Sequence, residues 1–275
     1  MIETEKTNYG NWIPRTFMTL WYSAVALLLA IELGLFFASV GTVVLWLVGV
    51  VLLLASLFTL YMQVCRWLFS FTGRGLMGRL HEYLLAHLDW DGHGQMLDIG
   101  CGAAALTVRC AHTYPQAQIT GIDYWGIGWN YAKEQCERNA AIEGVGEQTV
   151  FRKGDAAKLD FADGTFDAAV SNFVFHEVRT QPDKHLVVRE ALRVVRSGGS
   201  FAFLDLFGQK QLYGDMTAFV AQLRKEGISE IHYIANVEKQ PFMPAFLRTP
   251  WMMYGVGLIR SEEHTSELQS LVIIS

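Results

Sequence analysis

Two long apolar runs dominate the hydropathy pattern of the chain. They cover residues 17–38 and 41–65, with only the uncharged stretch of Ser39 and Val40 between them. From Thr16 to Cys65 the chain carries a single charged residue, Glu32. At about 1.5 Å per residue, the 22 residues of the shorter run reach roughly 33 Å as a helix, enough to cross a hydrocarbon core of about 30 Å. The pattern predicts a two-helix transmembrane hairpin over residues 16–70, preceded by an N-terminal segment of residues 1–15.

The basic residues around the hairpin predict its orientation. Lys6 and Arg15 precede it, Arg66, Arg74 and Arg79 follow it, and the loop between the runs has none. Because basic residues remain on the cytoplasmic side, we expect both ends of the hairpin in the cytoplasm and a two-pass protein of the cell membrane. A cleaved signal peptide fits poorly, since its apolar region would have about 7 to 15 residues and a cleavage site after it.

Glu32 is the exception within the apolar runs. An acidic residue inside a membrane is costly and is therefore a candidate functional residue. The alternative is a protonated side chain, or one that pairs with a hydroxyl group across the hairpin.

After Gly73 the pattern changes to short apolar stretches that alternate with amphipathic ones. The stretches that read as strands are residues 96–99, 117–122, 149–152, 166–171, 200–204, 228–234 and 251–259. The stretches that read as helices are residues 76–88, 104–113, 127–142, 183–196 and 215–226. Such alternation predicts an α/β domain in which helices cover both sides of a mostly parallel sheet. We expect one such domain over residues 75–260.

Composition agrees with this division into a membrane part and an α/β part. Of the 275 residues, 51% are hydrophobic and only 18% are charged, and the hairpin accounts for the excess. A net charge of -5 without a basic tract argues against a nucleic-acid partner. The cysteines at 65, 101, 110 and 136 have neither a C-x-x-C spacing nor one that suggests a metal site. We therefore expect no metal and a reducing compartment.

The segment MLDIGCGAAA at residues 96–105 carries the first chemical signal. Gly100 and Gly102 at the end of a strand let the backbone turn sharply where parallel sheets bind nucleotides. The glycine spacing alone also suits a dinucleotide-binding oxidoreductase. Asp98 argues against a pyrophosphate and favours a cationic ligand group, and Asp123 at the end of the next strand can accept both ribose hydroxyls of an adenosine cofactor.

Five motifs in this order resemble the class I S-adenosylmethionine (SAM) dependent methyltransferases. They are LDIGCG at 97–102, GID at 121–123, GDA at 154–156, FDAAVSN at 166–172 and ALRVVRSGGSFAFLD at 191–205. The most similar group is that of the ubiquinone/menaquinone-biosynthesis-type C-methyltransferases. The resemblance covers residues 75–260 and implies a Rossmann-like, mostly parallel seven-stranded sheet, with SAM as the cofactor.

The resemblance also implies roles for individual residues. Asp98 and the turn of Gly100, Cys101 and Gly102 would hold the methionine part of SAM. The remaining cofactor-binding residues would be Asp123 for the ribose, Tyr124 beside the adenine, Asp155 and Ala156 at the adenine edge, and Asn172 on the methyl-donor side. For Asp155 and Asn172 the alternative is turn capping. The chain departs from the family at Ala104, where the family has a third glycine.

The residues that follow the fourth strand are expected to face the substrate. Phe173 and Phe175 would line an apolar pocket that suits the loss of charge from the sulfonium. His176 with Glu177 is the best candidate for a catalytic base, and the alternative is that His176 caps a short helix or fills a pocket wall. The predicted function is methyl transfer to a small or lipid-like acceptor at the membrane. A dinucleotide-dependent oxidoreductase and a non-catalytic SAM-binding membrane sensor are the alternatives.

The last residues have a different character. From about Arg260 the chain resembles a translated sequencing adapter, and we expect residues 261–275 to be non-native; a genuine polar tail is the alternative.

Overall fold

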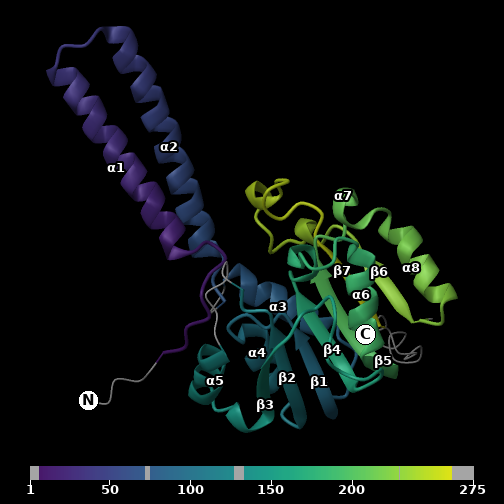
Figure 1. Ribbon diagram of the computed structural model, residues 1–275. Coiled ribbons are helices and arrows are strands. Elements are labelled where there is room, and N and C mark those ends of the chain that lie inside the picture. The colour runs from purple at the N-terminus through teal and green to yellow at the C-terminus, as the bar shows by residue number, and fades with distance from the viewer. Residues whose placement is uncertain (1–5, 72–74, 127–132, 229, 262–275) are drawn as a thin grey trace, which may run out of the picture. The chain divides into compact units, whose positions relative to one another are not determined.

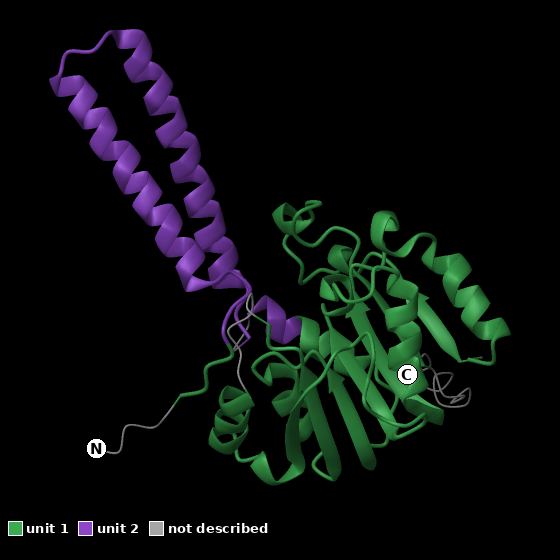
Figure 2. Ribbon diagram, viewed as in Figure 1, with its two compact units in different colours: residues 1–9, 80–275 green, residues 10–79 purple. Residues whose placement is uncertain are grey.

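The computed structural model describes residues 6–71, 75–126, 133–228 and 230–261. The chain forms two compact units, one of residues 10–79 and one of residues 1–9 and 80–275 (Figure 2). The boundary between them falls within helix α3 (Leu76–Ala86).

Unit 2 of Figure 2, residues 10–79, contains a helical hairpin. Helices α1 (Arg15–Phe37) and α2 (Thr42–Leu68) run side by side and are joined by residues 38–41 (Figure 1). The rings of Trp21 and Phe58 are 4.5 Å apart, and the Tyr22 hydroxyl donates a hydrogen bond of 2.6 Å to Gln63. By length and composition, both helices can cross a membrane, as their apolar runs predict.

Glu32 of α1 faces Gly49 of α2. A Cβ atom at Gly49 would lie 3.5 Å from Glu32 Oε1, an ordinary van der Waals contact, so the carboxyl group lies close to this glycine. Among the described residues, Glu32 Oε2 is buried and has no hydrogen-bond partner. The pairing with a hydroxyl group that was considered from the sequence is therefore not observed for this oxygen in the described part of the chain.

Unit 1 of Figure 2 is built on one sheet, which has seven strands in the order β3-β2-β1-β4-β5-β7-β6 within the described residues. The strands are β1 (Gly94–Ile99), β2 (Ala117–Asp123), β3 (Thr149–Lys153), β4 (Phe166–Asn172), β5 (Val195–Asp205), β6 (Ile231–Ile234) and β7 (Gly257–Ser261). The first five pair in parallel, and β7 pairs antiparallel with both β5 and β6. The mostly parallel sheet that the sequence predicts is confirmed.

Helices connect the strands and cover the sheet (Figure 1). They are α4 (Ala105–Thr113), α5 (Lys133–Ile142), α6 (Lys184–Arg193), the single turn α7 (Lys210–Tyr213) and α8 (Met216–Lys225). Apolar side chains of α6 and α8 share one buried cluster with the central strands, including Val187, Phe219, Leu97, Ala169 and Phe203. The carboxyl ends of β1, β2 and β4 therefore meet at one rigid edge, where the predicted site residues lie.

The observed elements differ from the predicted ones at several boundaries. Helix α6 ends at Arg193 and β5 begins at Val195, whereas the pattern predicts a helix to 196 and a strand from 200. Strand β7 begins at Gly257 rather than at 251 because Gly255 has a φ of 79° and its carbonyl accepts a hydrogen bond from Gly208. Residues 127–132 of the predicted helix over 127–142, and 262–275 of the expected non-native tail, lie outside the described residues. Arg260 and Ser261 are part of β7.

Candidate active site

The turn after β1 requires glycine. Gly100 has a φ of 79° and Gly102 a φ of 58°, a region that glycine enters at little cost. A Cβ atom at Gly100 would overlap the side chain of Val174. The backbone N–H groups of Gly100 and Cys101 both donate to the carbonyl of Ile122, at 2.8 and 2.9 Å, which ties the turn to the end of β2.

Asp98 lies at the base of this turn and is almost completely buried. Its Oδ2 accepts a 2.6 Å hydrogen bond from the hydroxyl of Thr107 on α4. Burial raises the pKa of Asp98 to about 7, although the Thr107 hydrogen bond works in the opposite direction, and the negative charge of Asp123 raises it further. A cationic group beside Asp98 would reverse this effect, since it favours the ionised carboxylate.

Asp123 links the ends of β1 and β2. Its Oδ2 accepts a 2.9 Å hydrogen bond from the Gly102 N–H, and its Oδ1 accepts one of 2.9 Å from Trp125. Burial raises the pKa of Asp123, while backbone hydrogen bonds from Trp125, Gly102 and Tyr124 oppose the rise. The carboxylate is thereby fixed at the mouth of the glycine turn.

The other residues predicted near the adenine lie at the same edge. The Gly154 N–H donates to the Asp123 carbonyl at 3.0 Å and brings Asp155 and Ala156 close to the end of β2. Asp155 Oδ1 accepts hydrogen bonds from the Ala157 N–H and the Thr180 hydroxyl, so it caps its own turn. Tyr124 is more exposed, at 57%, and its ring faces the ammonium of Lys153.

Asn172 ends β4 and pairs with a histidine that the sequence did not single out. Its Nδ2 lies 3.3 Å from Nε2 of His81, which α3 supplies. Burial lowers the pKa of His81 to about 3, and the charge of Arg109 lowers it further, so its imidazole is neutral near pH 7. Asn172 Oδ1 is buried and has no hydrogen-bond partner among the described residues. A buried amide oxygen in this position suits a donor group on a ligand.

His176 is part of a hydrogen-bonded dyad with Asp205, the last residue of β5. Nδ1 of His176 donates to Asp205 Oδ1 at 2.8 Å, and Nε2 lies 3.5 Å from Glu177 Oε1. Burial works to lower the pKa of His176, but the charge and hydrogen bond of Asp205, with the charge of Glu177, outweigh it and raise the pKa above its ordinary value. Asp205 is completely buried, yet its attraction to His176 and a backbone hydrogen bond from Leu206 hold its pKa low.

The two predicted substrate-facing phenylalanines have different surroundings. Phe173 has a φ of 58°, and its ring lies 6.5 Å from that of His176. Phe175 is fully buried in the core, 5.3 Å from the ring of Phe203. The core needs an apolar side chain at this point of the turn, so the expectation that Phe175 lines the substrate pocket does not match its position.

The glycine turn after β1 therefore brings Asp98, Gly102 and Asp123 together. His176 lies after the neighbouring strand, β4. Residues 97–203 match the model of the methyltransferase domain family, which covers most of this edge and the sheet beneath it. The sheet is the mostly parallel, seven-stranded one that the resemblance implies. The chain contains a class I SAM-dependent methyltransferase domain. SAM is accordingly the cofactor of this domain.

Curated relatives of the methyltransferase domain match the same part of the chain. A demethylmenaquinone methyltransferase of Desulfitobacterium hafniense is 38% identical over 112 residues, which cover 40% of this chain and 42% of the relative. A ubiquinone/menaquinone biosynthesis C-methyltransferase of Desulfotalea psychrophila is 31% identical and covers 46% and 47%. An arsenite methyltransferase of Aquipseudomonas alcaligenes is 33% identical and covers 44% and 35%. The chain thus spans less than half the length of these relatives.

Among solved structures, a geranyl diphosphate methyltransferase in complex with SAM superposes with a TM-score of 0.46 and 18% identity, covering 67% of this chain and 84% of that one.

Three residues at this edge of the sheet were not predicted as site residues from the sequence. They are His81, Asp205 and Lys184, whose ammonium donates to the carbonyls of Val178 and Gln181. Asp205 lies at the carboxyl end of an apolar strand, as Asp98 and Asp123 do. An acidic residue at such a strand end indicated the other two as site residues, and the same signal could have indicated Asp205. His81 has no such signal, because it comes from a helix 91 residues before its partner.

Proposed function

We propose that this chain is a membrane-anchored SAM-dependent methyltransferase whose catalytic domain is cytoplasmic and whose acceptor is small or lipophilic. The observation that carries the proposal is the glycine turn of residues 100–102, with a buried Asp98 beneath it and Asp123 hydrogen-bonded to it. Such a turn admits a ligand close to the backbone, and two carboxylates beside it favour a ligand that carries positive charge and ribose hydroxyls.

The residues of the turn fit SAM in the following way. Asp98 and the backbone of Gly100, Cys101 and Gly102 hold the methionine part, and Asp123 holds the ribose. Tyr124, Asp155 and Ala156 surround the adenine, although Asp155 also caps a turn. The unpartnered Oδ1 of Asn172 accepts a hydrogen bond on the methyl-donor side.

When bound, SAM supplies a methyl group that is already activated by its sulfonium. The protein then has to align the acceptor and remove its proton. With SAM and the acceptor bound, His176 would take the acceptor's proton at Nε2. Asp205 holds Nδ1–H and so keeps His176 in the required tautomer. Glu177, with a half-exposed side chain, adds negative charge near the imidazolium.

A lipophilic acceptor is supported by two features. The names of two relatives refer to menaquinone or ubiquinone, and the two long apolar helices would hold the domain at a membrane. We propose the corresponding division of the chain into a cytoplasmic segment (1–15), a transmembrane hairpin (16–70), the methyltransferase domain (75–260) and a non-native tail (261–275).

Titration calorimetry of the detergent-solubilised full chain with SAM tests the proposal. We expect binding that Asp123→Ala abolishes. Asp160→Ala, which removes an exposed carboxylate outside the turn, is the matched control and should bind as the unaltered chain does. Tight NAD binding without SAM binding would show the oxidoreductase alternative to be correct instead.

Turnover separates an enzyme from a sensor. Incubation with SAM and membrane extracts should release S-adenosylhomocysteine, and the identity of the labelled product would reveal the acceptor. SAM binding without any release would favour the non-catalytic sensor.

A further inference from the structure

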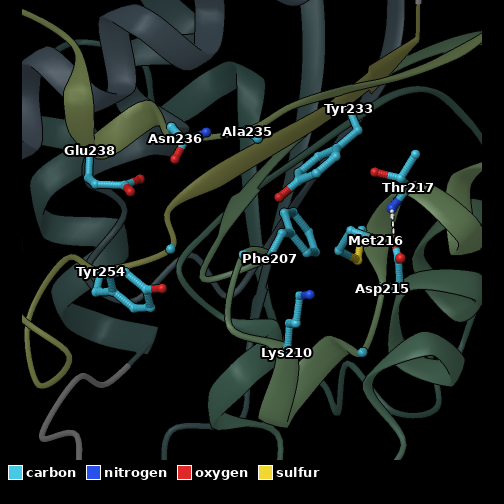
Figure 3. Close-up of a pocket in the computed structure, with 13 residues that line it drawn as sticks. Phe207, Lys210, Asp215, Met216, Thr217, Tyr233, Ala235, Asn236, Glu238 and Tyr254 are labelled. Atoms are coloured by element: carbon cyan, nitrogen blue, oxygen red, sulfur yellow. Dashed lines mark hydrogen bonds between the residues drawn. The ribbon is translucent and has the colours of Figure 1, made fainter.

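A cavity of about 230 Å³ lies in unit 1, apart from the glycine turn. It is formed by the segments that follow β5 and β6 and the segment that precedes β7, together with the start of α8 (Figure 3). With about 30 Å³ for each water molecule, it has room for about seven or eight water-sized groups. That is the size of a headgroup rather than of a whole lipid.

Glu238 is the unusual member of the lining. Its side chain belongs to a residue that is only 3% exposed, and Figure 3 shows its carboxylate directed from the chain toward the space between Tyr254 and Phe207. Its Oε2 is buried and has no hydrogen-bond partner among the described residues. A buried carboxylate oxygen without a partner costs free energy, and a donor group from a ligand would reduce that cost.

The other charges of the lining do not neutralise Glu238. Asp215 accepts hydrogen bonds from the Thr217 and Ala218 N–H groups and so caps α8. Lys210 is exposed and forms no ion pair with Glu238 in the described part of the chain. Burial raises the pKa of Tyr233, and the charges of Glu238 and Asp215 raise it further, so the cavity has a negative potential.

We propose that this cavity binds the ammonium group of an organic amine, with Glu238 as its ionic partner. The phenol of Tyr233 and the amide of Asn236 line the same space and can accept further N–H donors. A metal ion fits less well, because the described residues contain no group of three or more His, Cys, Asp or Glu side chains that would hold one. The amine is either a free small molecule or the headgroup of an aminolipid.

The position of the cavity relates it to the methyl acceptor. It lies beyond the carboxyl ends of β5 and β6, at the same edge of the sheet as Asn172 and His176. Two strand spacings, from β4 across β5 to β7, amount to about 10 Å. An acceptor of about that length could place its amine on Glu238 and another part beside His176. This second step rests on the proposed function, whereas amine binding does not.

Calorimetry without SAM tests whether the cavity binds an amine. Because SAM is left out, a negative result would count against amine binding and not against the proposed methyltransferase function. The probe is ethanolamine, added to the full chain in detergent, and its neutral analogue is ethylene glycol. We expect ethanolamine to bind and ethylene glycol not to bind. Glu238→Gln, which keeps the size of the side chain, should weaken binding at least tenfold. Glu226→Gln removes the same charge from an exposed site just after α8, outside the cavity, and should leave ethanolamine binding unchanged.

Lys210→Met, at an exposed position of the lining, provides a test in the opposite direction. Removing this positive charge should strengthen ethanolamine binding at least twofold. Equal binding of ethylene glycol, unchanged binding by Glu238→Gln, or weaker binding by Lys210→Met would each overturn the proposal.

Reconstitution separates the two sources of the amine. In phosphatidylglycerol nanodiscs the chain should bind free ethanolamine. If the natural ligand is a lipid headgroup, added phosphatidylethanolamine should compete with that binding; if it is a free amine, binding should remain the same. Absence of ethanolamine binding in both kinds of nanodisc would overturn the proposal.

Discussion

Two buried carboxylates near the carboxyl ends of β1 and β5 have pKa values shifted in opposite directions. Burial raises the pKa of Asp98 to about 7, because its only described side-chain partner is the neutral hydroxyl of Thr107. Asp205 is equally buried, but His176 and a backbone N–H hold its pKa low. Asp98 is therefore suited to bind a cationic group of a ligand, whereas Asp205 already stabilises the positive charge of protonated His176.

Asp98→Asn should separate stability from cofactor binding. The folded-state pKa of Asp98 lies above its unfolded value of 3.8, so the folded chain loses stability as the pH rises from about 4 to about 7. Asparagine removes this loss and still accepts the Thr107 hydrogen bond. We expect the SAM-free variant to be more stable at pH 8 by about 1–2 kcal/mol, measured by thermal unfolding.

The same substitution should weaken SAM binding at pH 8 at least tenfold, because the carboxylate no longer attracts the cationic part of the cofactor. Asp91→Asn, at an exposed position, is the control and should affect neither quantity. Unchanged SAM affinity of Asp98→Asn would contradict the assignment of Asp98 to the cofactor.

The pH dependence of turnover should report on His176. As a base it acts in its neutral form, so the rate should rise with pH through a midpoint above the ordinary histidine value of 6.5. In Asp205→Asn the attraction is lost while burial remains, so the midpoint should move below 6.5 and kcat should fall by about 10- to 100-fold.

Glu177→Gln should move that midpoint much less, since Glu177 is half-exposed and 3.5 Å from Nε2. A midpoint that Asp205→Asn leaves in place would mean that Asp205 has only a structural role.

At the scale of elements, the start of α4 carries backbone strain. Ala104 precedes this helix with a φ of 69° and is fully buried. The left-handed conformation costs an L-residue about 1–2 kcal/mol, which explains why glycine is favoured at such a position. The chain tolerates alanine here because the hydrogen bonds of the turn, including that from the Ala104 N–H to Cys101, hold the backbone in place.

Ala104→Gly should therefore stabilise the domain. Relief of strain exceeds the extra entropy that glycine loses on folding, for a net gain of up to about 1 kcal/mol, or about 2–4 °C in Tm. Ala111→Gly, inside α4, is the matched control and should lower the Tm because its backbone is helical. A lower Tm for Ala104→Gly would show that the buried methyl group contributes more than the strain costs.

At the scale of the whole molecule, cysteine labelling should define the topology of the hairpin. All four native cysteines are buried, so they give little background. In right-side-out vesicles we expect an impermeant maleimide to label Ser39→Cys, in the loop between α1 and α2. Lys6→Cys should react only after the membrane is opened. The reverse pattern would place the methyltransferase domain outside the cytoplasm.

The sequence by itself determined the order of helices and strands, the parallel sheet, the apolar hairpin and the turn from Asp98 to Gly102. Each of these depends on local periodicity or on residues close together in the chain. The predicted strand ends also identified Asp123 and Asn172, because carboxyl ends of parallel strands meet at one edge.

Only the tertiary structure decided which distant groups meet at that edge. It pairs His176 with Asp205 across 29 residues and Asn172 with His81 across 91. It also places Phe175 in the core and turns the chain at Gly255, so that Glu238 faces a cavity. These contacts follow from the packing of the whole sheet and its helices, and local patterns carry no information about them.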